Sequence, residues 1–190
     1  MIDPAMSSPA FERVDNDAYY TPAWCTEALL SKWRPSYQVW EPAAGHGHIV
    51  EVLDKAGIPV SATDLYDYVD LRRDMVIEGH DFLSNTLMPE IDGSFSIITN
   101  PPYNKAEEFV RRALELTEKH RGEVAMLFRH EWDCAKSRND LFTMPAFRGK
   151  VVLTKRPRWF EGTTTSPRHN FAWMIWDWRN VCRPILEYAP

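Results

Sequence analysis

Hydrophobic and polar residues follow two different periods along this chain, and each period predicts a different kind of element. Short apolar runs rich in β-branched and aromatic residues predict buried strands. Longer stretches in which apolar residues recur every three or four positions predict amphipathic helices. The clearest helical period lies in residues 105–119, where Phe109, Val110, Ala113 and Leu114 fall on one face.

The order of the predicted elements gives the fold class. The predicted strands are residues 37–40, 60–63, a third short strand or extended piece ending near Asp81 and Phe82, and then 95–99, 124–128, 151–154 and 171–176. The predicted helices are residues 23–33, 49–56 and 105–119, with a helical turn at 140–142 and a polar loop at 160–170. Strands that alternate with helices indicate an α/β protein with a largely parallel sheet.

Length and composition are those of one globular domain. The chain has 190 residues, of which 44% are hydrophobic, enough for a single core. We assign residues 16–185 to one domain and expect residues 1–15 to be a flexible N-terminal segment. No apolar run approaches the roughly 20 residues of a membrane span, and the N-terminus lacks the pattern of a signal peptide. We therefore expect no contact with a membrane.

Candidate metal ligands are few and scattered. Cys25, Cys134 and Cys182 form no CxxC pair, which argues against a zinc cage or a disulfide framework and favours a cytoplasmic protein. His46 and His48 lie two residues apart in a turn without a nearby cysteine, which is weak support for a metal site. We expect no metal.

Charge is divided unevenly between the two parts of the chain. Residues 1–120 contain 10 Lys and Arg against 20 Asp and Glu, whereas residues 121–190 contain 12 against 7. The second part is therefore positive in a chain whose net charge is −5. Either this clustering is accidental or the second part faces a polyanion such as a nucleic acid.

Polar residues at the ends of predicted strands indicate a ligand site. Glu41 ends the first strand and precedes a turn that contains Gly45 and Gly47 and opens a helix, and Asp64 ends the second strand. Glycines let a ligand approach the backbone, and an acid at this spacing suits ribose hydroxyls. Because a carboxylate at Glu41 can accept a hydrogen bond from an ammonium group, the set favours an adenosine-containing, amine-bearing ligand such as S-adenosylmethionine over NAD.

The stretch Asn100-Pro101-Pro102-Tyr103 follows the buried strand at 95–99 and suggests a reaction. Neither proline can donate a backbone hydrogen bond, and both fix φ near −65°. The side-chain carbonyl of Asn100 and the backbone carbonyl of Pro101 are then two fixed acceptors for a planar amino group, with the ring face of Tyr103 beside it. Acceptors placed in this way assist transfer of a group to an exocyclic amine of a nucleobase. A plain turn is the alternative interpretation.

These residues together resemble the class I S-adenosylmethionine-dependent methyltransferases of the (N/D)PPY type, which methylate amino groups. The resemblance is greatest to compact adenine-specific DNA methyltransferases, such as those of phages and prophages. It is carried by the motifs YYTP at 19–22, EPAAGHG at 41–47, Asp64, HDFL at 80–83 and NPPY at 100–103. It implies a Rossmann-like fold with a mostly parallel, seven-stranded sheet and helices on both faces.

The resemblance also implies roles for particular residues. The implied contacts of the cofactor S-adenosyl-L-methionine are Tyr20, Thr21, Pro22, Glu41, Pro42, Ala43, Gly45, Gly47, Asp64, Leu65, Asp81, Phe82 and Asn100. The implied catalytic residues are Asn100, Pro101, Pro102 and Tyr103.

Basic residues mixed with aromatic ones predict where a nucleic acid is bound. Arg158, Trp159 and Arg168 suit contact with a flipped or unpaired base, and Tyr103 completes the predicted substrate-binding set. For Trp159, packing in the core and contact with a base are equally compatible with the sequence. The same holds for His130 and Glu131, which either line the pocket or belong to a plain loop. The later tryptophans, Trp173, Trp176 and Trp178, are expected in the core.

The sequence therefore predicts methyl transfer to the exocyclic amine of adenine in DNA. The same chemistry on RNA adenine or on a protein glutamine is the first alternative, although glutamine enzymes usually carry a helical domain that has no counterpart before the first predicted helix. A non-catalytic scaffold that retains the fold to bind a partner is the alternative from another class. There is no room for a separate target-recognition domain, and the pattern determines neither the target sequence, the need for a specificity subunit nor the oligomeric state.

Overall fold

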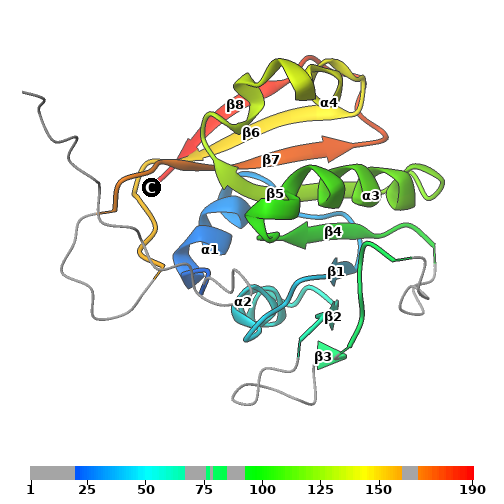
Figure 1. Cartoon of the computed structure of the whole chain (residues 1–190), viewed down its shortest axis with the longest axis vertical. Coiled ribbons are helices and arrows are strands. Elements are labelled where there is room, and N and C mark those ends of the chain that lie inside the picture. The colour runs from blue at the N-terminus through cyan, green and yellow to red at the C-terminus, as the bar shows by residue number, and fades with distance from the viewer. Residues whose placement is uncertain (1–19, 67–75, 78, 85–92, 160–166) are drawn as a thin grey trace, which may run out of the picture.

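One mixed β-sheet forms the centre of the molecule, which we describe from a computed structural model (Figure 1). The structure describes residues 20–66, 76–77, 79–84, 93–159 and 167–190. The predicted flexible segment at 1–15 and most of the predicted loop at 160–170 lie outside the described residues.

Eight strands of the described residues form the sheet, in the order β3-β2-β1-β4-β5-β7-β6-β8. Neighbouring strands are parallel, except that β7 runs antiparallel to both β5 and β6. Figure 1 shows β4 and β7 pointing in opposite directions. The predicted α/β fold with a mostly parallel sheet is confirmed. The strands are Val39–Glu41 (β1), Val60–Thr63 (β2), Val76–Ile77 (β3), Ser96–Thr99 (β4), Glu123–Arg129 (β5), Phe147–Leu153 (β6), Phe171–Asp177 (β7) and Ile185–Ala189 (β8).

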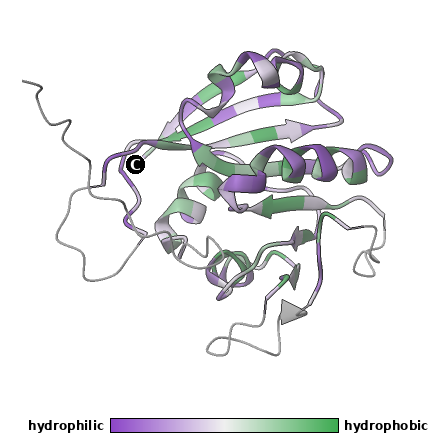
Figure 2. Cartoon of the chain, viewed as in Figure 1, coloured by the Kyte–Doolittle hydropathy of each residue, from purple (hydrophilic) through white to green (hydrophobic). Residues whose placement is uncertain are grey.

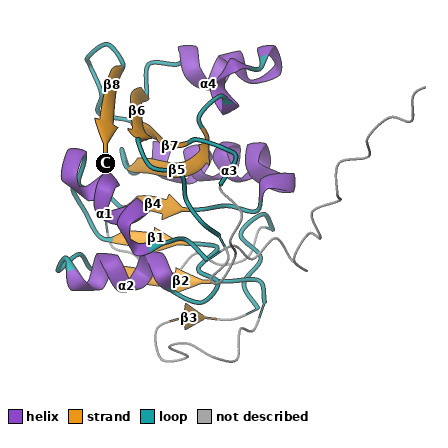
Figure 3. Cartoon of the chain, turned by 90° about the vertical axis from the view of Figure 1, so that its left-hand side faces the viewer, coloured by secondary structure: helices purple, strands orange, loops and turns teal. Residues whose placement is uncertain are grey.

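Helices cover both faces of the sheet, as predicted (Figure 3). The helices α1 (Ala23–Lys32) and α2 (His48–Lys55) lie on one face, and α3 (Ala106–Glu118) and α4 (Asn139–Thr143) lie on the other. Their bounds agree with the predicted ones to within one residue at each end. Figure 2 shows β4 as largely hydrophobic and the outward side of α3 as largely hydrophilic.

Alternation along the central strands divides the core into two hydrophobic clusters. In β5, Val124, Met126 and Phe128 pack in the cluster that contains α3, whereas Ala125 and Leu127 pack in the cluster that contains α1 and α2. All five side chains are fully buried. A central strand buried on both faces loses the alternation of polar and apolar residues, which explains why β5 is a continuous apolar run in the sequence.

The late tryptophans behave largely as predicted. Trp173 and Trp176 in β7 are fully buried. Each indole N–H donates a 2.8 Å hydrogen bond to a backbone carbonyl oxygen, that of Cys25 for Trp173 and that of Leu141 for Trp176. Trp178 is half-buried just beyond the end of β7.

The third strand is not where the sequence predicts it. β3 comprises only Val76 and Ile77, so the prediction of a strand ending near Asp81 and Phe82 is wrong. Asp81 instead begins a turn, in which the backbone N–H and the hydroxyl of Ser84 both donate to its carbonyl oxygen. A strand of two residues within a charged stretch is too short to show any period.

The eighth strand is an addition to the seven that the resemblance implies. β8 pairs with β6 alone, and half-exposed residues such as Leu186 and Tyr188 give it no buried apolar run in the sequence. Its close approach depends on Gly149 of β6, which has a φ of 140°. A Cβ atom at that position would lie 1.9 Å from the carbonyl oxygen of Ile185.

Candidate active site

The carboxyl ends of β1 and β4 lie side by side, and the direction in which strands are added to the sheet reverses between them. From β1 the chain proceeds outward to β2 and β3, and it then returns to β4 on the other side of β1. Ligands of open α/β sheets bind at such a reversal, beyond the carboxyl ends of the strands. Glu41, Asp64 and Asn100 end or directly follow β1, β2 and β4 at this edge.

Two glycines with positive φ build the turn between β1 and α2. Gly45 has a φ of 51° and Gly47 a φ of 79°, which side chains disfavour. The N–H of Ala44 donates to the carbonyl oxygen of Thr63 (3.1 Å), and that of Gly47 donates to the carbonyl oxygen of Ala44 (2.8 Å). These bonds fix the turn against the end of β2, directly before α2.

Asp64 closes the same turn from β2. Its Oδ2 accepts a hydrogen bond from the N–H of Gly45 (2.7 Å) and its Oδ1 accepts one from the N–H of Tyr66 (2.9 Å). Burial raises the pKa of Asp64, although these N–H groups oppose the shift. Each carboxylate oxygen keeps a second lone pair, so the residue can shape the turn and still accept a bond from a ligand hydroxyl.

Glu41 is the most unusual residue of the site. Its side chain is fully buried, and neither carboxylate oxygen has a hydrogen bond of normal geometry to a described residue. Burial raises the pKa of Glu41 well above its ordinary value; the Thr99 hydroxyl and the backbone of Ala43 oppose this shift, and Asp64 adds to it. A buried carboxyl whose neighbouring donors form no hydrogen bond of normal geometry costs free energy unless a bound group compensates for it. Glu41 is thus a candidate contact for a cationic or hydrogen-bond-donating ligand.

Asn100 has one half of its amide group engaged and the other half open. Its Nδ2 donates to the hydroxyl of Thr21 (3.1 Å), whereas its buried Oδ1 has no partner among the described residues. Thr21 is itself buried and lies just before α1, so residues 79 positions apart in the sequence meet at this bond. The side-chain carbonyl of Asn100 is therefore an acceptor of fixed orientation.

Tyr20 lies over the histidines of the glycine turn. Its ring is 4.8 Å from that of His46 and 5.2 Å from that of His48, measured between centroids, and 42% of the residue is exposed. These contacts place Tyr20 of the predicted YYTP motif against the EPAAGHG turn. The three rings thus lie close together beside the turn.

Tyr103 begins a short 3-10 helix, Tyr103–Lys105, directly after the two prolines. Pro101 is buried, and Pro102 has an extended conformation with φ −59° and ψ 123°. The half-buried ring of Tyr103 lies 6.2 Å from that of Phe171, and the ring of Trp159 lies 4.8 Å from Phe171 in an edge-to-face contact. Two predicted substrate-binding residues thus meet on one buried phenylalanine.

Several solved structures that superpose on this chain are named methyltransferases. The 23S rRNA methyltransferase ErmE superposes with a TM-score of 0.55 at 22% identity, over 87% of this chain and 69% of that one. A Pyrococcus horikoshii protein provisionally named an RNA methyltransferase gives 0.55 at 17% identity, over 85% and 86%. A Listeria monocytogenes protein provisionally named a class I S-adenosylmethionine-dependent methyltransferase gives 0.52 at 17% identity, over 88% of this chain but only 62% of that one. The chain has the class I methyltransferase fold.

The sequence itself has no close relative in two further comparisons. No protein-family model and no curated protein matches it. At identities this low the methyltransferase fold is shared, whereas the activity has to be argued from the site.

The remaining cofactor-motif residues divide into buried and exposed ones. His80 donates its backbone N–H to the carbonyl oxygen of Asp64 (2.9 Å), which places residues 79–84 beside the end of β2. Phe82 is only 3% exposed and packs on Trp40 and Phe109, so its ring belongs to the core beneath the site. The carboxylate of Asp81 accepts a hydrogen bond from the N–H of Leu83 (3.0 Å).

The other predicted cofactor contacts differ in exposure. Leu65, at the end of β2, is 47% exposed, while Pro22 and Ala43 are half-buried and Pro42 is buried.

The basic residues predicted to contact a substrate lie on the surface. Arg158 and Arg168 are exposed. The Nζ atom of Lys155 lies 5.9 Å from the centroid of the Trp24 ring. Arg156 has a structural role instead, because its Nε donates to the side-chain oxygen of Asn170 (2.8 Å). This bond joins the two sides of the connection between β6 and β7.

Sequence reasoning did not identify Thr21 and Phe171 by their tertiary roles. Thr21 is predicted only as a contact of the cofactor, whereas its hydroxyl accepts a hydrogen bond from the side chain of Asn100. Phe171 begins an apolar run, which predicts a strand and gives no sign that its ring contacts both Tyr103 and Trp159. Both roles depend on contacts between distant segments, which no local period reports.

His130, whose N–H donates to the carbonyl oxygen of Asn170, is half-buried, and Glu131 is exposed.

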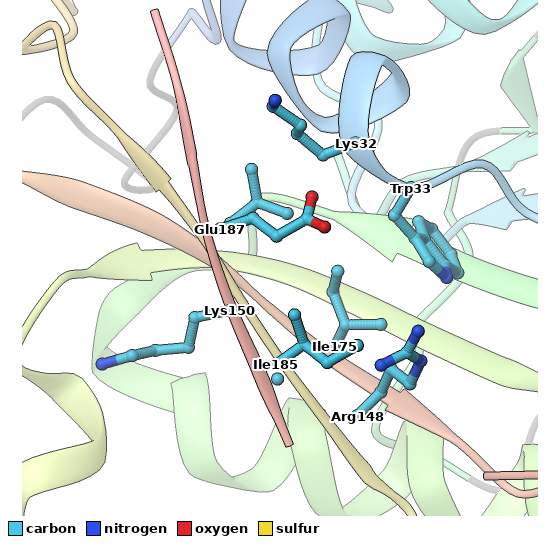
Figure 4. A pocket seen from close by; sticks show the side chains of 9 residues that line it. Lys32, Trp33, Arg148, Lys150, Ile175, Ile185 and Glu187 are labelled. Atoms are coloured by element: carbon cyan, nitrogen blue, oxygen red, sulfur yellow. The ribbon is translucent and has the colours of Figure 1, made fainter. Parts of the chain in front are cut away.

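A separate pocket lies away from these motifs (Figure 4). It is formed where the end of α1 meets β6, β7 and β8, and Figure 4 shows Trp33, Arg148 and Glu187 around an apolar floor of Ile175 and Ile185. Because α1 begins beside the motifs at Pro22 and ends at Lys32 on this pocket, the two sites lie at opposite ends of that helix. The pocket contains none of the predicted site residues.

Neither a metal cluster nor a membrane-spanning helix occurs in the described part of the chain. Residues 20–66, 76–77, 79–84, 93–159 and 167–190 contain no group of three or more His, Cys, Asp or Glu side chains that could hold a metal ion. No helix within these ranges is long and apolar enough to cross a membrane.

Proposed function

We propose that this chain transfers a methyl group from S-adenosyl-L-methionine to the exocyclic amine of adenine in a nucleic acid. The observation that carries the proposal is the pair of buried, unpartnered acceptors at the carboxyl ends of adjacent strands, Glu41 on β1 and Asn100 after β4. One acceptor suits the ammonium group of the cofactor, and the other suits the amino group of the base.

The residues around the glycine turn fit the cofactor. Glu41 supplies the buried carboxylate that a methionine ammonium group would neutralise. Asp64, at the end of β2, keeps lone pairs for ribose hydroxyls, and the exposed Leu65 offers an apolar surface beside them. At Gly45 and Gly47, no atom of another described residue, chain neighbours apart, lies within 4 Å of the position that a Cβ would take, so the turn leaves space there.

Asn100 is suited to fix the acceptor amine in place. Its Oδ1 is open and its Nδ2 is bonded to Thr21, so the amide presents a hydrogen-bond acceptor without having to reorient. When bound, S-adenosyl-L-methionine supplies an electrophilic methyl group: the amine lone pair forms the new C–N bond as the S–C bond breaks, and the nitrogen then releases one proton to water. An acceptor that holds an amine proton helps to keep that lone pair on nitrogen, which is electrostatic stabilisation by a preorganised group.

Tyr103 and Trp159 are the candidate surfaces on which the base stacks. Both are half-buried, and both contact Phe171, so a base entering beside Asn100 meets aromatic rings rather than solvent. Enzymes that modify a base bind it outside the stack of a duplex or in a single strand. Exposed Arg158 and Arg168 are suited to the phosphates on either side.

DNA and RNA both satisfy this chemistry, and the names of the similar structures favour RNA. The NPPY resemblance predicts DNA, whereas ErmE is named a 23S rRNA methyltransferase and the Pyrococcus protein is provisionally named for RNA. RNA therefore takes precedence over a protein glutamine as the second candidate and is tested alongside DNA.

The test is incubation of the purified chain with labelled S-adenosyl-L-methionine and separate pools of DNA, RNA and protein, followed by nucleoside analysis. The expected result is N6-methyl-2′-deoxyadenosine from the DNA pool or N6-methyladenosine from the RNA pool, and the nucleoside identifies the polymer. Binding of the cofactor without transfer to any pool would favour the non-catalytic scaffold. Absence of cofactor binding in calorimetry would overturn the proposal altogether.

A further inference from the structure

Three aromatic rings from distant parts of the sequence meet beside the candidate site. The ring of Phe171 lies 6.2 Å from that of Tyr103 at a tilt of 35°, and 4.8 Å from that of Trp159 at 73°. All three residues belong to the same hydrophobic cluster. Phe171 is thus a neighbour that the two predicted base-binding rings share.

The backbone at Phe171 is fixed from several sides. Phe171 pairs with Arg129 as the first residue of β7 in the antiparallel ladder with β5. The preceding residue, Asn170, accepts a hydrogen bond from the N–H of His130 at its carbonyl oxygen (2.9 Å) and one from Arg156 at its side-chain oxygen (2.8 Å). Phe171 is 3% exposed, so its ring is confined by packing as well.

The two rings that Phe171 contacts are attached to less regular segments. Tyr103 begins a 3-10 helix of three residues, and Trp159 lies outside any helix or strand. Both are only half-buried. A ring on such a segment has more freedom than a ring on a central strand, and the fixed member of the cluster therefore sets the positions of the other two.

We infer that Phe171 is a positioning residue for base capture, holding Tyr103 and Trp159 at the separation at which they contact the base. The inference rests on the proposed function. Phe171 is itself too buried to touch a substrate and acts through the other two rings. Its removal should therefore weaken capture of the acceptor and leave binding of the cofactor intact, because the cofactor motifs lie on β1 and β2.

The chain offers a matched control in Phe147. It is also the first residue of a strand, β6, is 8% exposed and contacts two aromatic rings, those of Phe142 at 5.1 Å and Trp176 at 5.6 Å. It belongs to the hydrophobic cluster on the other face of the sheet, whereas Phe171 belongs to the one that includes Tyr103 and Trp159. Loss of either ring leaves a cavity of the same kind, and only one of them lies beneath the predicted base-binding rings.

The experiment compares Phe171→Ala with Phe147→Ala in the full chain. Thermal melting measures the loss of packing, calorimetry measures affinity for S-adenosyl-L-methionine, and steady-state kinetics separates KM for the nucleic acid from kcat. We expect both variants to melt at similarly lowered temperatures and to bind the cofactor as the wild type does. KM for the acceptor should rise about tenfold or more in Phe171→Ala alone, since stacking on a base is worth roughly 1–3 kcal/mol.

Two further arms make the result decisive. Phe171→Leu and Phe147→Leu repeat the comparison with a smaller loss of packing, so the test holds if an Ala variant does not fold. Equal KM values in the matched variants would overturn the inference and make Phe171 a core residue only. Failure of the wild-type chain to methylate any nucleic acid would instead overturn the proposed function, and this inference with it.

Discussion

At the scale of single residues, the candidate site is distinguished by acceptors that the fold buries without giving them partners. Most buried polar groups in proteins are hydrogen-bonded, so an unpartnered one at the carboxyl ends of the parallel strands calls for an explanation. Glu41 and the Oδ1 of Asn100 both meet that description. Two variants test whether ligands account for them.

Asn100→Ala tests the acceptor for the target amine. The variant should lose methyl transfer by about 100- to 1000-fold, as is typical when one preorganised group that stabilises a transition state is removed. Affinity for S-adenosyl-L-methionine should stay nearly unchanged, because the interaction matters most in the transition state. Single-turnover kinetics and calorimetry measure the two quantities. Asn104→Ala, at an exposed asparagine four residues further on, is the control, and an Asn100→Ala enzyme with wild-type turnover would remove Asn100 from catalysis.

Glu41→Gln tests the buried carboxyl through its pH dependence. Because burial raises the pKa of Glu41 well above 4.5, the unfolded chain releases this proton at a lower pH than the folded chain does. Between the two pKa values the folded state binds more protons, so the free energy of unfolding falls as pH rises, by at most about 1.4 kcal/mol per pH unit. Glutamine cannot ionise and escapes this penalty.

Relative to the wild type, Glu41→Gln should therefore gain stability as the pH rises above 4.5, while it binds S-adenosyl-L-methionine more weakly because it cannot pair with an ammonium group. Urea denaturation at a series of pH values measures the first effect, and calorimetry measures the second. A stability difference that does not vary with pH would show that Glu41 does not retain its proton on folding.

At the scale of the element, the short strands of the sheet depend on close backbone approaches that particular residues permit. The glycine turn between β1 and α2 requires positive φ at Gly45 and Gly47. The pairing of β6 with β8 requires Gly149, since any side chain there would collide with the backbone of Ile185.

Gly149→Ala should displace β8 from the sheet. Gly93→Ala is the matched control, because Gly93 also has a positive φ, of 76°, but no atom of a described residue lies within 4 Å of the position that its Cβ would take. The backbone conformation costs both variants roughly 1–2 kcal/mol, and overpacking costs Gly149→Ala about 1–3 kcal/mol more. Denaturant unfolding measures the difference, and hydrogen exchange in residues 185–189 shows whether β8 is released. Equal losses in both variants would mean that the contact relaxes without cost.

At the scale of the whole molecule, the places where the fold exposes charged residues matter more than the net charge of the chain. The net charge of −5 argues against a nucleic-acid partner. Yet Arg158 and Arg168 are exposed at the connection between β6 and β7, next to Trp159 and Phe171. A local group of cations is sufficient to bind phosphates when it lies beside the site.

Replacing both Arg158 and Arg168 by Gln should weaken binding of nucleic acid and lessen its dependence on salt. For a single strand, loss of two phosphate contacts reduces the slope of log K against log salt by about 1.4. Fluorescence anisotropy at several salt concentrations measures that slope. The control replaces Lys119 and Arg183, which are exposed near the amino ends of the strands. An unchanged slope in the first variant would show that the basic residues do not contact phosphates.

The class of the fold can be predicted from the residues alone, and so can the position of the candidate site along the chain. Apolar runs buried on both faces and amphipathic helices such as α3 show their periods locally, so they can be predicted without knowledge of any partner. Polar residues at strand ends indicate the site because parallel strands present their carboxyl ends at one edge. Glu41, Asp64 and Asn100 were found in this way.

Which acceptors stay open and which rings meet become known only from the folded chain. The orientation of the Asn100 amide depends on Thr21, which is 79 residues away, and Tyr103 and Trp159 meet on Phe171. β3 and β8 likewise escape prediction, because a strand at the edge of a sheet takes its conformation from hydrogen bonds to its neighbour more than from its own apolar residues. Local periods report what each segment buries, whereas contacts between segments exist only once the chain has folded.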